Sequence, residues 1–358
     1  MRILNESHFH QTYISKHTEA NCLLDIETLQ KFDSQNMHES YNQWPEIARN
    51  QYEKNLDGLD FGEIEHVIFS GMGGSGAIGD IFSSILSKTN IHVDVVKGYL
   101  LPKTVDSKTL VVTTSVSGNT EETLSVLSAA ADLNCESISF SDGGKMEKMC
   151  KEKNLNYRKI SMIHSPRVSF PAFLFSILRV LEPFLPIERN DIWDSIKKLE
   201  KQKEIISSDN LNEKNPALSL ANWISEIPLI YYPWGLQAAA IRFKNSLQEN
   251  AKMHAMTEDI IEACHNGIVS WENKSNVKPI LIQGKDDYVK TQIRWKIVKE
   301  FFNERKIEYH EINSEEGSIL SKLINLIYVL DYSTIYRAVM SKIDPSPVVP
   351  IGFIKEKL

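Results

Sequence analysis

Two stretches of the chain combine glycines with hydroxyl side chains, and this mixture can bind an anion. FSGMGGSGAIGD follows an apolar run, and TTSVSGNTEET follows a second apolar run about forty residues later. Glycine lets backbone N–H groups approach a ligand closely, and hydroxyls add donors at the positive end of a helix. We therefore predict a phosphate site formed by Gly73, Gly74 and Ser75 in the first stretch and Ser115, Ser117, Gly118 and Thr120 in the second.

Other interpretations of the two stretches stay open at this point. Gly71, Gly73 and Gly76 satisfy the G-x-G-x-x-G pattern of a dinucleotide site. Such a site needs an acidic side chain at the end of the second strand, whereas HVDVVKGYL ends near Lys97 with Asp94 inside the strand. A nicotinamide-dependent oxidoreductase is therefore disfavoured. The plain structural alternatives are a tight turn for the first stretch and helix capping for the second.

The elements that must position these residues alternate between strand and helix, which predicts an α/β fold. Strands joined through helices lie parallel, so we expect doubly wound, mainly parallel sheets flanked by helices. In the first half we predict strands near residues 66–72, 91–97, 109–115 and 136–140, and helices near 78–86 and 120–133. In the second half we predict strands near 228–232, 277–283 and 307–312, and helices near 235–255 and 290–303.

A chain of 358 residues is long enough for two domains. An apolar helix stripe amid dense charge, from Ile192 to Leu199, suggests a boundary between them. We predict a first domain over 1–190, with an N-terminal helical segment packed against its sheet. The second domain is predicted over 191–358, with a C-terminal tail or helix.

Composition excludes several classes of protein. The net charge of −7 gives no excess of basic residues that would indicate nucleic-acid binding. Four scattered cysteines read as reduced thiols, and we find no residues with convincing metal-ligand spacing. The start lacks an apolar signal segment, and the most apolar stretch, 170–187, contains Arg179 and Glu182. We expect a cytoplasmic protein without membrane contact, metal or cofactor.

Taken together, the motifs resemble the SIS (sugar isomerase) superfamily, and specifically the bifunctional phosphoglucose/phosphomannose isomerases. They occur in the family's order: GMGGSGAIGD, GYLLP, LVVTTSVSGNTEETLS, SPR, RFKNSLQENAK, CHN, DPSPV and IKEKL. The resemblance implies two tandem SIS domains in a homodimer. It also implies a carbohydrate-metabolism enzyme that interconverts glucose 6-phosphate and/or mannose 6-phosphate with fructose 6-phosphate, through ring opening and an enediol(ate).

The resemblance also assigns roles to individual residues. Glu249 matches the base, and one carboxylate can remove and return the proton. His265 matches the histidine used in ring opening, commonly contributed across the dimer interface. Arg167 matches an arginine that steadies negative charge. Lys355 matches a terminal lysine that contacts the sugar, although Lys357 is close enough to compete. The serines and Thr120 predicted above match the phosphate-binding positions.

One departure concerns TEDIIEACHN, where the family commonly has a proline–glutamate pair before its histidine, and it leaves the sugar preference open. Two further alternatives remain. A noncatalytic sugar-phosphate sensor would keep the phosphate loops but has no use for a positioned base. An amino-sugar-phosphate isomerase or deaminase would use the same fold for another reaction.

Overall fold

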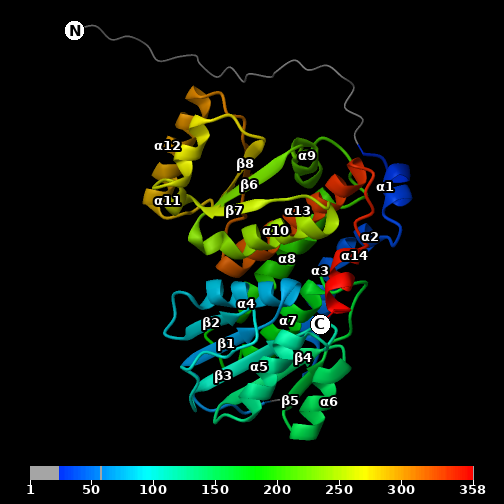
Figure 1. Cartoon of the computed structure of the whole chain (residues 1–358), viewed down its shortest axis with the longest axis vertical. Coiled ribbons are helices and arrows are strands. Elements are labelled where there is room, and N and C mark those ends of the chain that lie inside the picture. Colours follow the sequence, from blue (N-terminus) through cyan, green and yellow to red (C-terminus); the bar gives the residue numbers. More distant parts are fainter. Residues whose placement is uncertain (1–23, 57–58, 358) are drawn as a thin grey trace, which may run out of the picture.

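A computed structural model describes residues 24–56 and 59–357 of the chain, so Cys22 lies outside the described residues. Figure 1 shows two β-sheets, one in each half of the chain, with a layer of helices between them. Every strand pair within each sheet is parallel in the described structure. This arrangement confirms the predicted doubly wound α/β fold.

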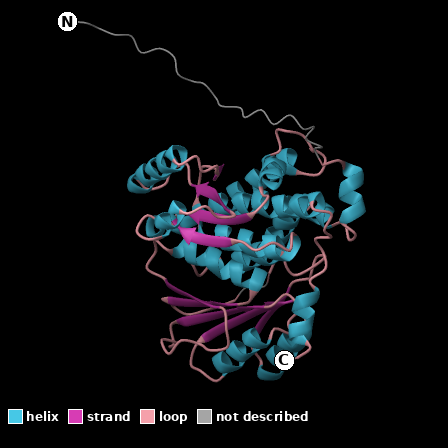
Figure 2. Cartoon of the chain, turned by 45° about the horizontal axis from the view of Figure 1, so that its top comes forward, coloured by secondary structure: helices cyan, strands magenta, loops and turns pink. Residues whose placement is uncertain are grey.

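The first sheet has the strand order β2-β1-β3-β4-β5, and its strands lie side by side in Figure 2. Its predicted strands are present with small shifts at their ends, and one additional strand, β5, was not predicted. The connection after β1 runs outward to β2, whereas the connection after β3 runs the other way to β4, which creates a switch point between the carboxyl ends of β1 and β3. The strands are β1 (His66–Ser70), β2 (His92–Val96), β3 (Thr109–Thr114), β4 (Glu136–Ser141) and β5 (Asn156–Lys159).

Helices cover both faces of this sheet. The inner face, toward the second half, is covered by α4 (Gly73–Leu86) and α7 (Phe170–Leu181). Almost every side chain of α7 is buried, as expected for the most apolar stretch of the chain. The outer face is covered by α5 (Glu121–Ala131) and α6 (Gly144–Lys153), which form small apolar clusters of their own with the strands.

The second sheet has the order β7-β6-β8-β9. The predicted helix over 235–255 is shorter than expected: it ends at Asn250, and a short connection leads from it to the edge strand β7. Lys252 adopts a left-handed backbone conformation, with φ of 56°, which ends the helix. The strands are β6 (Ile227–Tyr232), β7 (Met256–Asp259), β8 (Val277–Gln283) and β9 (His310–Asn313).

The helices of the second half again lie on both faces of their sheet. Those on the inner face are α10 (Gln237–Asn250) and the long α13 (Ile319–Met340), and both contact α4 of the first half. The outer face carries α11 (Ile260–Ala263) and α12 (Val289–Glu304). Two 3₁₀ turns complete this half: η1 (Trp234–Leu236) and η2 (Gly267–Glu272).

The remaining helices join the two halves through one large hydrophobic core. Trp44 stacks on Tyr41 and on Tyr328 of α13, with ring centroids 4.4 and 5.4 Å apart. The N-terminal helices were predicted to pack against the first sheet, but they pack mainly on the helices between the sheets. These joining helices are α1 (Ile26–Phe32), α2 (Met37–Asn42), α3 (Trp44–Glu53), α8 (Arg189–Ile206) and α9 (Pro216–Trp223).

The chain's last helix, α14 (Val349–Lys355), follows the proline-rich segment and returns to the side of the first half (Figure 1). A segment that is remote in sequence from the glycine-rich turns is thereby brought close to them. Among the described residues, no helix is long and apolar enough to cross a membrane.

Candidate active site

The first glycine-rich turn connects β1 to α4 at the switch point of the first sheet. Gly73 has φ of +52°, a conformation that other residues rarely adopt. A β-carbon on Gly71 would lie 2.9 Å from the Ser75 β-carbon and 3.0 Å from the Thr114 carbonyl oxygen. The turn therefore packs directly against the end of β3, where the second predicted stretch begins.

The second stretch folds into a compact loop before α5. The Ser115 and Thr120 hydroxyl oxygens lie 2.8 Å apart, so these two predicted residues are in direct contact. Ser117 is exposed, and its hydroxyl oxygen accepts a hydrogen bond from the Asn119 N–H at 3.3 Å. A β-carbon on Gly118 would lie 1.8 Å from the Gly143 carbonyl oxygen, which explains the glycine. Thr120 is the N-cap residue of α5, but its hydroxyl bonds Ser115.

Arg167 and Glu249 come from different halves of the chain and meet next to the first turn. Arg167 Nη1 lies 3.4 Å from Glu249 Oε2. The Arg167 side chain is buried, whereas that of Glu249 is 27% exposed, so the carboxylate keeps access to a ligand. A β-carbon on Gly74 would lie 3.6 Å from the Arg167 α-carbon. The predicted base and the predicted arginine are thus adjacent to each other and to the glycine turn.

Hydrogen bonds hold the Arg167 guanidinium in place. Its Nε donates to Asn250 Oδ1 at 2.7 Å, and its Nη2 donates to the carbonyl oxygens of Pro345 and Ser346, each at 2.8 Å. Asn250 Nδ2 in turn donates to Thr334 Oγ1 at 2.8 Å. The DPSPV segment is therefore part of the site because its backbone carbonyls orient the arginine.

Residues spaced four apart on α10 build the layer beneath this pair. Arg242 donates to Asp331 from Nε at 3.0 Å and from Nη2 at 2.6 Å, and it also donates to the Arg167 carbonyl oxygen at 2.9 Å. Ser246 donates to the other oxygen of Asp331 at 2.8 Å. Arg242 and Asp331 are both almost fully buried. Sequence reasoning assigned no role to this pair, because its members are 89 positions apart.

Lys252 is another residue of the site that sequence reasoning missed. Its Nζ donates to the Glu249 carbonyl oxygen at 2.6 Å and to the Pro345 carbonyl oxygen at 3.2 Å. Burial, and after it the nearby Arg167 guanidinium, lowers the pKa of the Lys252 ammonium from its usual value. Its position in the QENAK segment was the available signal, since the residue lies three positions after the predicted base.

A cavity of about 740 Å³ opens beside these groups, between the two halves of the chain. Gly73 contributes from the first turn, Glu249 and Lys252 from the end of α10, and Val349 to Ile351 from the first turn of α14. Its size suits a small organic ligand. A ligand in this cavity can contact the Glu249 carboxylate while reaching the glycine turn.

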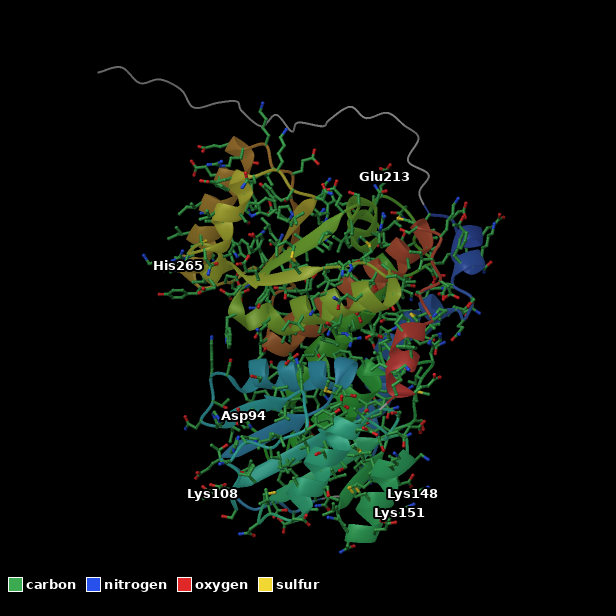
Figure 3. All side chains as sticks on the ribbon, in the orientation of Figure 1. Asp94, Lys108, Lys148, Lys151, Glu213 and His265 are labelled. Carbon is green, nitrogen blue, oxygen red and sulfur yellow. The ribbon has the colours of Figure 1, made fainter. Side chains whose placement is uncertain are left out.

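His265 and Lys355 lie away from this group within the chain. His265 follows α11 and is exposed on the outer side of the second half, where Figure 3 labels it. Lys355 is the last residue of α14 and is also exposed, although the first turn of that helix lines the cavity. Lys357 lies with its ammonium 4.9 Å from the Phe353 ring centroid.

The end of β2 bears on the dinucleotide alternative. Asp94 lies inside the strand, and the residue that follows the strand is Lys97. Lys97 Nζ bonds both carboxylate oxygens of Asp80, at 2.7 and 2.6 Å. A lysine with this partner offers no acidic group for a ribose, so the first turn lacks what a nicotinamide site needs there.

Each half of the chain matches a known protein family. Residues 61–181 match the family described as "SIS domain", and residues 213–358 match "Bacterial phospho-glucose isomerase C-terminal SIS domain". A bifunctional phosphoglucose/phosphomannose isomerase of Caldicellulosiruptor bescii is 31% identical over 335 residues, covering 90% of this chain and 98% of that protein. The chain belongs to the family of bifunctional phosphoglucose/phosphomannose isomerases. This membership confirms the predicted family, the two SIS domains and the enzyme class of sugar-phosphate isomerases.

A second relative supports the assignment to the phosphoglucose/phosphomannose isomerase family, and a solved structure supports the fold. The bifunctional phosphoglucose/phosphomannose isomerase of Aquifex aeolicus is 28% identical and covers 89% of this chain and 95% of its own. The C-terminal domain of the Francisella tularensis glucosamine-fructose-6-phosphate aminotransferase has the same fold, with a TM-score of 0.62 at 15% identity, covering 86% of this chain and 96% of its own. Residues 182–212 lie between the two matched segments, so the domain boundary at residue 190 stays a prediction. The roles of single residues stay predictions too.

Proposed function

We propose that this protein interconverts fructose 6-phosphate with glucose 6-phosphate and/or mannose 6-phosphate, with Glu249 as the base. The observation that carries the proposal is the contact between Glu249 and Arg167 at a cavity that begins at the glycine turn. Aldose–ketose isomerisation needs a base that takes a proton from one carbon and returns it to the next. A carboxylate with one side toward the cavity suits that task.

The charge that develops in the intermediate needs a fixed positive group nearby. Arg167 is held by three hydrogen bonds to neutral acceptors, and its Nη1 faces the Glu249 carboxylate. An enediolate formed beside Glu249 would lie within reach of this guanidinium. A donor that is already oriented stabilises such a charge without rearranging during the reaction.

The phosphate end of the substrate is assigned to the two loops at the switch point. Ser75, Ser115, Ser117 and Thr120 contribute hydroxyls there, and the N-termini of α4 and α5 contribute N–H groups. This arrangement can hold a phosphate without a basic patch, in keeping with the net charge of −7.

A homodimer is part of the proposal because His265 is remote from Glu249 within one chain. Val289, Ile293 and Ile297 form an apolar stripe on α12, with 57%, 43% and 58% of their surfaces exposed. The stripe lies on the helix that packs against α11, the helix before His265. A partner bound at this face would cover apolar surface and could bring His265 to the partner's cavity for ring opening.

Two further parts of the proposal concern Lys355 and the location of the protein. Lys355 would contact the sugar from α14, the helix whose first turn lines the cavity. A cytoplasmic location fits Cys135, Cys150 and Cys264, which are all free thiols.

The purified protein would be assayed with fructose 6-phosphate in EDTA, with glucose 6-phosphate and mannose 6-phosphate followed separately. Formation of either product supports the proposal, and their ratio gives the epimer preference. Binding of fructose 6-phosphate without turnover would favour the sensor, and release of ammonia from glucosamine 6-phosphate would favour the deaminase.

A further inference from the structure

Three side chains with metal-binding atoms converge at the beginning of the first two strands. His66 begins β1, His92 begins β2, and the two are partners in the strand register. Side chains two positions apart on a strand share a face, so Asp94 lies on the same side of β2 as His92. His66 Nε2 lies 3.0 Å and His92 Nε2 lies 3.5 Å from Asp94 Oδ2, and all three candidate ligand atoms lie within 4.8 Å of one another.

The two separations from Asp94 suit a zinc-class ion. Nitrogen and oxygen ligands about 2.0–2.2 Å from a tetrahedral zinc ion are themselves roughly 3.4 Å apart. The two distances to Asp94 lie on either side of that value. Two histidines and one carboxylate form a common zinc ligand set that leaves the fourth position to water. We propose that His66, His92 and Asp94 form a binding site for a divalent transition-metal ion, with zinc as the best fit.

The environment of His66 favours its role as a metal ligand. Thr109 is its register partner on β3, and Thr109 Oγ1 lies 3.4 Å from His66 Nδ1. That hydroxyl donates to Asp106 Oδ1 at 2.9 Å and accepts from the Asp106 N–H at 3.0 Å. Because the proton of this hydroxyl is already committed, its oxygen is placed to accept a hydrogen bond from His66 Nδ1. Without an ion, His66 Nε2 and Asp94 Oδ2 lie 3.0 Å apart, within hydrogen-bond distance. With an ion bound, Nδ1 would carry the ring proton and donate to Thr109, and Nε2 would be left for the ion, as in histidines whose second ring nitrogen is held by a hydrogen bond.

The site is half enclosed and lies on a rigid base. The His66 side chain is 9% exposed, Asp94 37% and His92 67%, so one wall is buried and the open side admits an ion. It lies at the amino ends of the strands, whereas the glycine turns follow the carboxyl ends. The length of β1, roughly 16 Å for its five residues, separates the two places. A bound ion would fasten the edge strand β2 to β1 and take no part in isomerisation.

The full-length, tag-free protein would be titrated with ZnCl₂ by calorimetry at neutral pH. The chain has ten histidines, so zinc can bind at other places as well. The informative result is therefore which step of the titration a variant loses relative to the wild type. His92→Ala removes an exposed ring, and Asp94→Asn keeps the shape of the carboxylate it replaces. Each is expected to weaken one step at least tenfold, by the magnitude typical of altered metal sites. Glu63→Gln, a nearby exposed carboxylate outside the group, is expected to leave every step unchanged.

Thermal unfolding gives a second measurement. Zinc is expected to raise the Tm of the wild type and of Glu63→Gln more than the Tm of His92→Ala, because an ion that binds only the folded state stabilises it. Turnover of fructose 6-phosphate in EDTA is expected to be unchanged by His92→Ala. Equal zinc binding by wild type and His92→Ala, or no saturable binding by either, would overturn the proposal. The group would then be a histidine–aspartate ion pair only.

Discussion

Arg167 Nη1 lies 3.4 Å from Glu249 Oε2, although the two residues come from different halves of the chain. The loop before α7 brings the arginine, and the last turn of α10 brings the glutamate. Both lie beside the glycine turn that ends β1. The contact unites a candidate base, a charge-stabilising group and a phosphate loop, which are the parts that the proposed isomerisation needs.

The Arg242–Asp331 pair is expected to support the site by stabilising the folded chain. Arg242→Met would leave the Asp331 carboxylate buried with Ser246 and Tyr41 as its remaining donors. Breaking a buried pair in this way costs about 3–5 kcal/mol of unfolding free energy. Urea denaturation followed by circular dichroism would measure the loss.

Lys151→Met is the matched control, because Lys151 is exposed and pairs with Glu147 on the surface (Figure 3). Its loss should change the unfolding free energy by less than about 1 kcal/mol. Similar small effects of the two substitutions would contradict the structural role of Arg242.

Ser117 is expected to act in substrate binding. Its exposed hydroxyl accepts one long hydrogen bond from its own loop, so it can donate to a phosphate. A hydrogen bond to a charged group contributes about 1.5–3 kcal/mol, so Ser117→Ala should raise the KM for fructose 6-phosphate by roughly 10- to 100-fold with little change in kcat. Ser87→Ala removes an exposed hydroxyl that bonds the Ser84 carbonyl and serves as the control. An unchanged KM in Ser117→Ala would remove this residue from the site.

Both glycine-rich loops and Glu249 could be predicted from the sequence because their neighbours in the chain carry the signal. Arg242 and Asp331 could not, since one buried ion pair joins two helices and no local pattern reports it. The end of α10 was predicted too late because the helix pattern runs on to Ala255, whereas the left-handed turn at Lys252 ends the helix earlier. The strand β7 was missed because its short sequence, MTED, is mostly polar. His66, His92 and Asp94 were missed as a group because only strand pairing brings them together.

Lys252 should impose a pH dependence on substrate binding. Its ammonium is present at low pH and is lost as the pH rises through its lowered pKa, below the range of an exposed lysine. Loss of that charge at the cavity should weaken binding of the anionic substrate. The KM should therefore begin to rise at a lower pH than it would if Lys252 had the pKa of an exposed lysine. In Lys252→Arg the guanidinium stays charged, and the rise should disappear. Steady-state kinetics from pH 7 upward would measure both profiles, and identical profiles would count against the role.

The proposed position of His265 predicts complementation between two inactive variants. Glu249→Gln and His265→Ala homodimers are each expected to have little activity. In a mixed dimer, one of the two sites would combine the intact Glu249 of one chain with the intact His265 of the other. Random subunit exchange should therefore restore about a quarter of the wild-type activity. No recovery after exchange, verified by mass spectrometry, would show that the two residues act within one chain or not together.

The most direct test of the central claim compares turnover and binding in Glu249→Gln. The account predicts that kcat for fructose 6-phosphate falls by about 10²–10⁴-fold, the usual contribution of a general base. Binding of sorbitol 6-phosphate, which has no carbonyl group to isomerise, should stay close to that of the wild type when measured by calorimetry. Turnover by Glu249→Gln at a rate near that of the wild type would contradict the assignment of Glu249 as the base.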